Sequence, residues 1–150
     1  MSWLIVRTDA RKESYVAAQI AGHGHDAWVP AQMIPVRPHG ARKLTAKAGV
    51  TIKELPILPR RVFVQVDWHE ANSFASIRHV QGVERDGEER VILIPDAQVA
   101  SFRAEIDREN TSALALAQAR SRKQKAKWRS LQEGLIDLID SAKQKMSQAA

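Results

Sequence analysis

The sequence contains no cysteine and no long hydrophobic run. Without cysteine the chain forms neither a disulfide framework nor a thiolate zinc site, which fits a reducing compartment. No segment approaches the roughly 18 consecutive apolar residues of a transmembrane helix, so we expect no membrane partner. The first apolar run, WLIV, is too short for a signal peptide and has no small-residue cleavage site behind it. These absences predict a soluble, cytoplasmic protein.

Catalytic and metal-binding motifs are also missing. The chain has no G-x-S-x-G nucleophile, no H-E-x-x-H zinc helix and no phosphate loop. Its one metal-like cluster is His23-Gly24-His25-Asp26, which we interpret as a polar turn because no third, distant ligand is evident. We therefore expect neither an enzyme nor a cofactor or metal.

Aromatic residues make up only 5% of the chain, so stacking platforms for nucleic-acid bases are not obvious. Charge is more informative, because the net charge of +6 is unevenly placed. Residues 37–61 and 111–129 carry +6 each, whereas residues 62–110 carry −5. A basic stripe beside an acidic half predicts one face for a polyanion and another for a basic protein. An ordinary solvated surface is the alternative.

Two basic segments are candidate contacts to nucleic acid. The first is a glycine-containing loop around Gly40, where the backbone can follow a phosphate chain. The second is the run of basic residues from position 120 to 129. Such clusters bind nucleic acid without sequence preference and with steep salt dependence. The candidate residues in the two segments are Arg37, Arg42, Lys43, Lys47, Arg120, Arg122, Lys123, Lys125 and Lys127.

Hydrophobic periodicity predicts an α+β fold with a mixed or antiparallel sheet of four to five strands, flanked by helices. Strands are expected at 3–8, 27–30 and 61–67, with a hairpin-like excursion between the last two and a hairpin turn at Asp86-Gly87. Helices are expected at 11–21 with Asp9 as N-cap, at 69–80, and at 97–109 after Asp96.

The chain changes character after residue 110. Residues 111–148 contain no proline and one glycine, and apolar residues fall on one helical stripe from Trp128 to Met146. We therefore divide the chain into a domain at 1–110 and a helical tail at 111–150, basic first and amphipathic afterwards. Residues 128–146 are expected to dock on the domain, on a partner or on a second copy.

The segment ELPILPRRVFVQVD places two prolines and two arginines directly against a strand. Strand alternation puts Val62, Val64 and Val66 on one face, and Phe63 on the other face between Arg61 and Gln65. Pro59 cannot donate to a sheet ladder, so it belongs at the entrance of the strand. This arrangement indicates that the Phe63 face points outward and serves something outside the core.

The order of these motifs resembles the N-terminal domain of the NusG/RfaH family of transcription elongation factors, over about residues 3–109. The resemblance rests on WLIVRT, a glutamate-containing helix, WVP, a basic excursion, ILPRRVFV, SIRHVQGV and a short IP before the last helix. Its most specific part is Val29-Pro30 followed by ILPRRVFV, which is similar to the family's phenylalanine-proline-glycine-tyrosine strand entrance.

The resemblance implies a protein that bridges the DNA cleft of RNA polymerase and suppresses pausing, working at the nucleoid. A concave surface would grip the clamp helices of the largest subunit. By position, the polymerase-binding residues would be Pro30, Leu58, Pro59, Arg60, Arg61 and Phe63, with Asn72 and Ser73 at the opposite jaw. Arg11 and Lys12 lie where relatives approach the exposed DNA strand.

The sequence departs from the family in two ways. Leu58, Arg60 and Arg61 stand where the family has phenylalanine, glycine and tyrosine, so an apolar grip has become partly cationic. The tail also lacks the glycine pattern and strands of the family's C-terminal barrel. If the tail covers the docking surface, it would be autoinhibitory. The alternative function is a small structural nucleic-acid-binding protein that oligomerises through the tail and no longer binds polymerase.

Overall fold

The protein is an α+β molecule, as predicted, in a computed structural model that describes residues 2–36, 51–66, 74–115 and 122–148. The strands in these residues are β1 (Ser2–Thr8), β2 (Ala27–Trp28), β3 (Ala31–Val36), β4 (Thr51–Pro56), β5 (Arg61–Val66), β6 (Val80–Val83) and β7 (Ile94–Pro95). The helices in these residues are α1 (Glu13–Gly22), α2 (Asp96–Ala115) and α3 (Arg122–Gln148).

Strand β1 is the centre of the main sheet. It pairs antiparallel with β5 on one side and with β6 and β7 on the other, and β2 extends the sheet beyond β5. The register places Leu4 opposite Val64 and Ile5 opposite Phe63. All four side chains are fully buried. The strand expected at 3–8 is therefore present and is covered on both faces.

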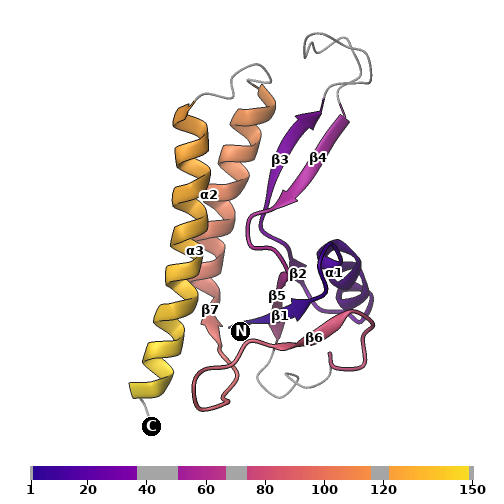
Figure 1. Cartoon of the computed structure of the whole chain (residues 1–150), viewed down its shortest axis with the longest axis vertical. Coiled ribbons are helices and arrows are strands. Elements are labelled where there is room, and N and C mark those ends of the chain that lie inside the picture. Colours follow the sequence, from indigo (N-terminus) through magenta and orange to yellow (C-terminus); the bar gives the residue numbers. More distant parts are fainter. Residues whose placement is uncertain (1, 37–50, 67–73, 116–121, 149–150) are drawn as a thin grey trace.

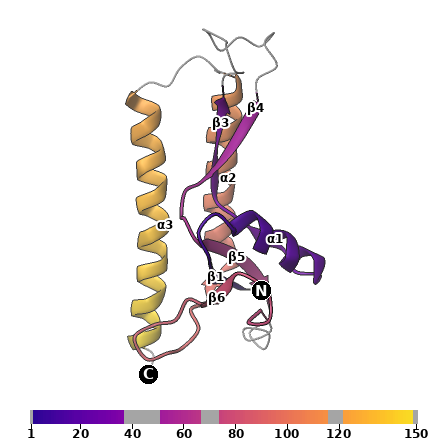
Figure 2. The ribbon, with the colours of Figure 1, turned by 45° about the vertical axis from the view of Figure 1, so that its right-hand side comes forward.

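The two faces of this sheet belong to two separate apolar clusters. Leu4, Val6 and the three valines of β5 pack with Val16 and Ile20 of α1. Trp3, Ile5 and Phe63 point to the opposite face, where side chains of α2 and α3 join the same cluster. Figures 1 and 2 show this arrangement, with α1 on one side of the sheet and the α2–α3 pair on the other.

Strands β3 and β4 form a second, two-stranded sheet that runs beside α2 (Figure 1). They are the arms of the predicted hairpin-like excursion, whose loop lies outside the described residues. The buried Asn110 of α2 closes the edge of β3, because its amide nitrogen donates to the Ala31 carbonyl at 2.9 Å. Its side-chain oxygen accepts from the Met33 amide at 2.9 Å. Asn110 thus takes the place of a neighbouring strand.

Two predictions for the domain are wrong. Asp9 does not cap α1, whose N-cap is Lys12 without a side-chain cap bond. The carboxylate of Asp9 instead accepts hydrogen bonds from His79 and Gln81, and these bonds lower the pKa of Asp9. Residues 74–79 of the predicted helix at 69–80 form turns. The backbone of His79 has φ 71°, which interrupts a helix, and its carbonyl accepts from the Asp9 amide.

The turn predicted at Asp86-Gly87 is present beyond β6. Arg85 and Val91 form an isolated antiparallel bridge, and the Asp86 amide donates to the Arg90 carbonyl at 2.9 Å. The buried Asp86 carboxylate accepts from the backbone amides of Glu88 and Arg90. These donors lower the pKa of Asp86, because they stabilise its charged form.

Helices α2 and α3 lie side by side and run in opposite directions (Figure 1). Close approach depends on Gly134 of α3, since a Cβ there would lie 3.0 Å from a ring carbon of Phe102. Lys127 of α3 also pairs with Glu105 of α2 at 2.9 Å. The predicted tail helix is therefore present. Helix α2 runs through residue 110, where we placed the domain boundary, and that boundary stays a prediction.

Candidate functional site

The strand entrance, residues 57–60 between β4 and β5, makes hydrogen bonds with three other parts of the chain. The Ile57 amide donates to the Pro30 carbonyl at 2.8 Å, and the Thr8 amide donates to the Arg60 carbonyl at 2.9 Å. The Arg60 amide donates to the buried carboxylate of Glu13 at 2.8 Å. The turn that presents Arg60 is therefore fixed to β1 and to the start of α1.

Arg60 has a left-handed backbone, with φ 65°. Residues other than glycine adopt this conformation at a cost of roughly 1–2 kcal/mol. Arg60 occupies the position that corresponds to glycine in the motif that the sequence resembles. The backbone of this turn therefore has the conformation that favours glycine, although the side chain is a cation.

The expectation that the Phe63 face points outward is wrong. Phe63 is fully buried and Leu58 is 2% exposed. Both belong to the apolar cluster beneath α3, whose stripe contributes Trp128, Leu131, Leu135 and Ile139. The amphipathic part of the tail thus docks on the domain, the first of the three places that the sequence allowed.

Polar contacts fasten α3 at the edges of this apolar interface. Near its middle, Gln132 donates to the Ile57 carbonyl at 2.9 Å. Further along, the ammonium of Lys143 lies 3.7 Å from the carboxylate of Glu84, which also holds Arg61 at 3.2 Å. Glu84 is largely buried, so a lost partner there costs more than at an exposed ion pair.

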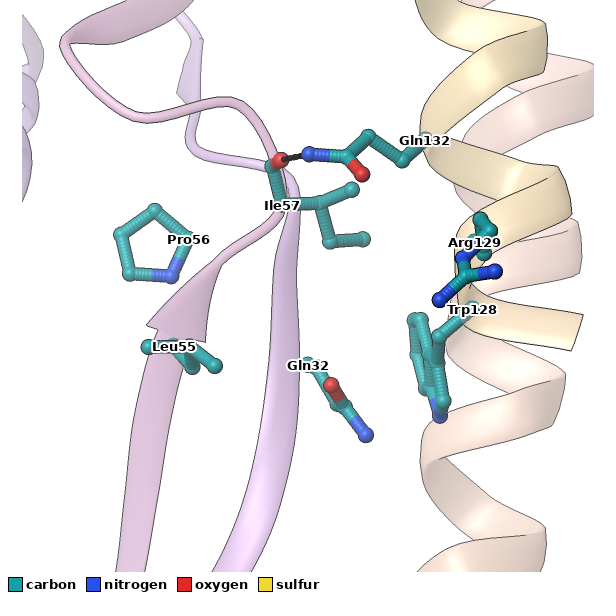
Figure 3. A pocket seen from close by; sticks show the side chains of 7 residues that line it. All are labelled: Gln32, Leu55, Pro56, Ile57, Trp128, Arg129 and Gln132. Atoms are coloured by element: carbon teal, nitrogen blue, oxygen red, sulfur yellow. Dashed lines mark hydrogen bonds between the residues drawn. The ribbon is translucent and has the colours of Figure 1, made fainter. Parts of the chain in front are cut away.

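Two hollows lie along the junction between α3 and the strand entrance. One holds about 210 Å³ and is lined by Gln32, Leu55, Pro56, Ile57, Trp128, Arg129 and Gln132 (Figure 3). The other holds about 230 Å³ and is lined by Leu58, Pro59, Arg61, Glu84, Gln132, Ile136, Ile139, Asp140 and Lys143. Gln132 lines both, so its bond to Ile57 stands where the hollows meet. Helix α3 therefore covers the entrance without filling it.

The structure separates the predicted polymerase-binding residues into two groups. Pro30, Leu58 and Phe63 are buried, whereas Pro59 and Arg60 are exposed and Arg61 is half-buried. These six residues do come together around one strand entrance. Asn72 and Ser73 lie outside the described residues.

Most of the predicted nucleic-acid contacts fall where the structure gives no description. Arg37, Arg42, Lys43, Lys47 and Arg120 lie outside the described residues, as do the side chains of Arg122, Lys123 and Lys125. Arg11 and Lys12 are exposed at the start of α1. Lys127 pairs with Glu105, and this hydrogen bond raises the pKa of Lys127.

Sequence reasoning missed the residues that tie the site together. Glu13, Glu84 and Gln132 each bond to a residue more than 20 positions away. An isolated glutamate or glutamine belongs to no sequence pattern that predicts such a distant partner. The two glutamates are recognisable only after folding, as carboxylates buried beside arginines.

Neither a membrane helix nor a metal cluster is found in the part of the chain that the structure describes. None of its helices is both long and apolar enough to cross a bilayer. It also contains no group of three His, Asp or Glu side chains placed to hold an ion.

Comparison with known proteins agrees with the motif order. The family model NusG, described as transcription termination factor nusG, matches residues 1–103. No curated protein was found to match the chain. The matched residues contain the main sheet, α1, the strand entrance and the first part of α2. Because the match covers more than half of the 150 residues, this chain belongs to the NusG family of transcription factors.

Proposed function

We propose that this protein is a non-enzymatic factor that binds RNA polymerase across its DNA cleft and suppresses pausing or termination. The observation that carries the proposal is the strand entrance, which lies inside the family match and has a left-handed turn at Arg60. In this proposal Leu58, Pro59 and Phe63 meet the clamp helices, and Arg60 and Arg61 meet acidic groups beside them.

Such a factor works by differential binding. It shifts polymerase toward the closed, elongating state to the extent that it contacts that state better than the paused one. Arg11 and Lys12, exposed at the start of α1, approach the DNA strand in this scheme. The basic segments at 37–47 and 120–127 add affinity for DNA or nascent RNA that decreases with salt.

Helix α3 then acts as an inhibitor of its own chain. It buries Leu58 and Phe63, so polymerase and α3 compete for one apolar surface. The apparent affinity for polymerase is reduced in proportion to the fraction of molecules in which α3 is displaced. We expect the displacement of α3 to begin beside the two hollows, where the hydrogen bond from Gln132 to Ile57 holds the helix.

The test measures capture of the protein by immobilised RNA polymerase from its host. The double variant Gln132→Ala with Lys143→Ala removes two contacts at the edges of α3 and leaves the docking residues unsubstituted. We expect it to bind polymerase about tenfold more tightly than the wild type, because two edge contacts are lost from the covered state. Adding Leu58→Asp to this variant should abolish the gain.

The control is Tyr15→Ala, an exposed side chain on α1 that leaves the α3 junction unchanged. Arg61→Glu is a poor probe, since it places a second carboxylate beside Glu84 and disturbs α3 as well. If neither the wild type nor the loosened variant binds polymerase while both still bind DNA, the proposal is wrong. The structural nucleic-acid-binding function would then be preferred.

A further inference from the structure

The flank of α3 beside the two hollows carries an exposed stripe that nothing in the described fold covers. Its members are Ala126, Arg129, Glu133, Ile136 and Asp140, which recur every three or four residues and so share one side of the helix. Arg129, Ile136 and Asp140 also line the hollows. The apolar stripe of α3, which faces the sheet, is a separate surface.

Charge is strongly polarised along α3. Residues 122–129 hold five basic side chains and no acid, residues 130–140 hold three acids and no base, and Lys143 and Lys145 follow in the last part of the helix. The first turn of the helix contains no acidic residue. This order is unfavourable for an isolated helix, whose N-terminal end favours negative charge. A partner that brings acidic groups to the basic half would offset this.

We propose that the partner is a second copy of this chain, bound through an antiparallel pair of α3 helices whose two-fold axis crosses the exposed stripe midway between Arg129 and Glu133. In this register Arg129 of one copy faces Glu133 of the other, and Ala126 faces Ile136. The symmetry repeats each contact, as in any two-fold interface. The basic half of each helix then lies against the acidic half of its partner.

The opposite orientation is excluded by the same charges. A parallel pair would place the basic halves together and the acidic halves together, and like charges in register repel. The antiparallel pair turns both repulsions into attractions. Charge complementarity therefore favours a second copy of α3, bound in the antiparallel orientation.

The stripe also offers apolar surface and room for a second helix. Ile136 is 42% exposed and Leu55, on the wall of the neighbouring hollow, is 45% exposed. They are two of the three large apolar side chains that remain exposed in the described part of the chain. In this register residues 122–140 of each α3 face one another, so the two helices overlap over about 28 Å.

The test is sedimentation equilibrium of the whole protein with charge reversals at the facing pair. Arg129→Glu alone places glutamates opposite glutamates, and Glu133→Arg alone places arginines opposite arginines. We expect each variant to weaken the dimer about tenfold or more, because the two-fold axis doubles the effect. An equal mixture of the two single variants should form heterodimers with nearly wild-type affinity, and the double variant should again self-associate.

The matched control is Asp107→Arg, a charge reversal at an exposed position of α2. Circular dichroism of each variant establishes that the helices are intact. A wild type that stays monomeric at every concentration overturns the proposal. Dimers that survive both single reversals, or single variants that fail to pair in the mixture, also overturn it. The inference does not depend on polymerase binding, so its failure leaves the proposed function untouched.

Discussion

At the scale of single residues, the strand entrance depends on one buried carboxylate and one strained backbone. Glu13 accepts the Arg60 amide, and the left-handed φ of Arg60 directs the chain into β5. Neither residue is part of the apolar core, yet together they determine where Pro59 and Arg61 lie. A cation therefore stands in a turn whose backbone conformation favours glycine.

We therefore predict that Arg60→Gly leaves stability unchanged or raises it by up to about 1 kcal/mol. Glycine relieves the left-handed strain but gains freedom in the unfolded chain, so the two effects partly cancel. Arg60→Val should lower stability by about 1–3 kcal/mol, since a β-branched residue tolerates this φ poorly. Urea denaturation measures both. Equal stability of the glycine and valine variants would contradict the strain at Arg60.

The buried Asp86 makes a prediction about pH. Backbone donation from Arg90 is the largest cause that lowers its pKa below the ordinary value of 3.8. A carboxyl whose pKa is lower in the folded state stabilises the fold above the unfolded pKa. That stability is lost as pH falls through the folded pKa. Unfolding free energy should thus decrease below about pH 4, and less steeply in Asp86→Asn. Thermal melts from pH 6 to pH 2 test this, and parallel curves would contradict it.

At the scale of elements, the β3–β4 sheet owes its position to α2. A lone two-stranded hairpin is marginally stable, and here one of its edges is paired to Asn110. The pairing links positions 77 and 79 residues apart, so it also joins the second sheet to the body of the molecule.

Asn110→Ala should lower the free energy of unfolding by about 1–3 kcal/mol, because it leaves the half-buried Met33 amide and Ala31 carbonyl without their Asn110 partner. The effect should be greatest locally, with faster hydrogen exchange at the Met33 amide than at the amides of β1. Thr111→Ala, next to it on an exposed face, is the control. Unchanged exchange at Met33 would show that α2 does not hold the hairpin.

At the scale of the whole molecule, α3 decides which surface the protein presents. It covers the apolar face of the sheet with four buried side chains and leaves a charged stripe outside. The same helix thus hides the surface proposed for polymerase and exposes the surface proposed for a second copy.

Leu135→Asp should release α3 from the sheet, because a carboxylate replaces a fully buried side chain at the centre of the interface. We expect red-shifted emission from Trp128 and rapid proteolysis within α3, while the circular dichroism of the sheet is retained. Ser130→Asp, at an exposed position of the same helix, should behave like the wild type. Cooperative loss of the sheet together with α3 would mean that the helix is part of one folding unit.

The sequence alone determined which residues share a face of β5 and which form the apolar stripe of α3. Alternation in β5 separated Val62 from Phe63, and the spacing of Leu131 and Leu135 predicted an amphipathic helix. Both follow because side-chain direction repeats with the local backbone geometry. The motif order likewise indicated the family and the α+β fold.

Only the tertiary structure decided which surfaces meet. The sequence left α3 free to pack on the domain, a partner or a second copy, and folding placed it over Phe63. The turns at 74–79 and the role of Asp9 were likewise set by a contact with His79, 70 positions along the chain. Local sequence patterns cannot predict such partners. The partners depend on which distant groups pack together and form hydrogen bonds in the folded chain.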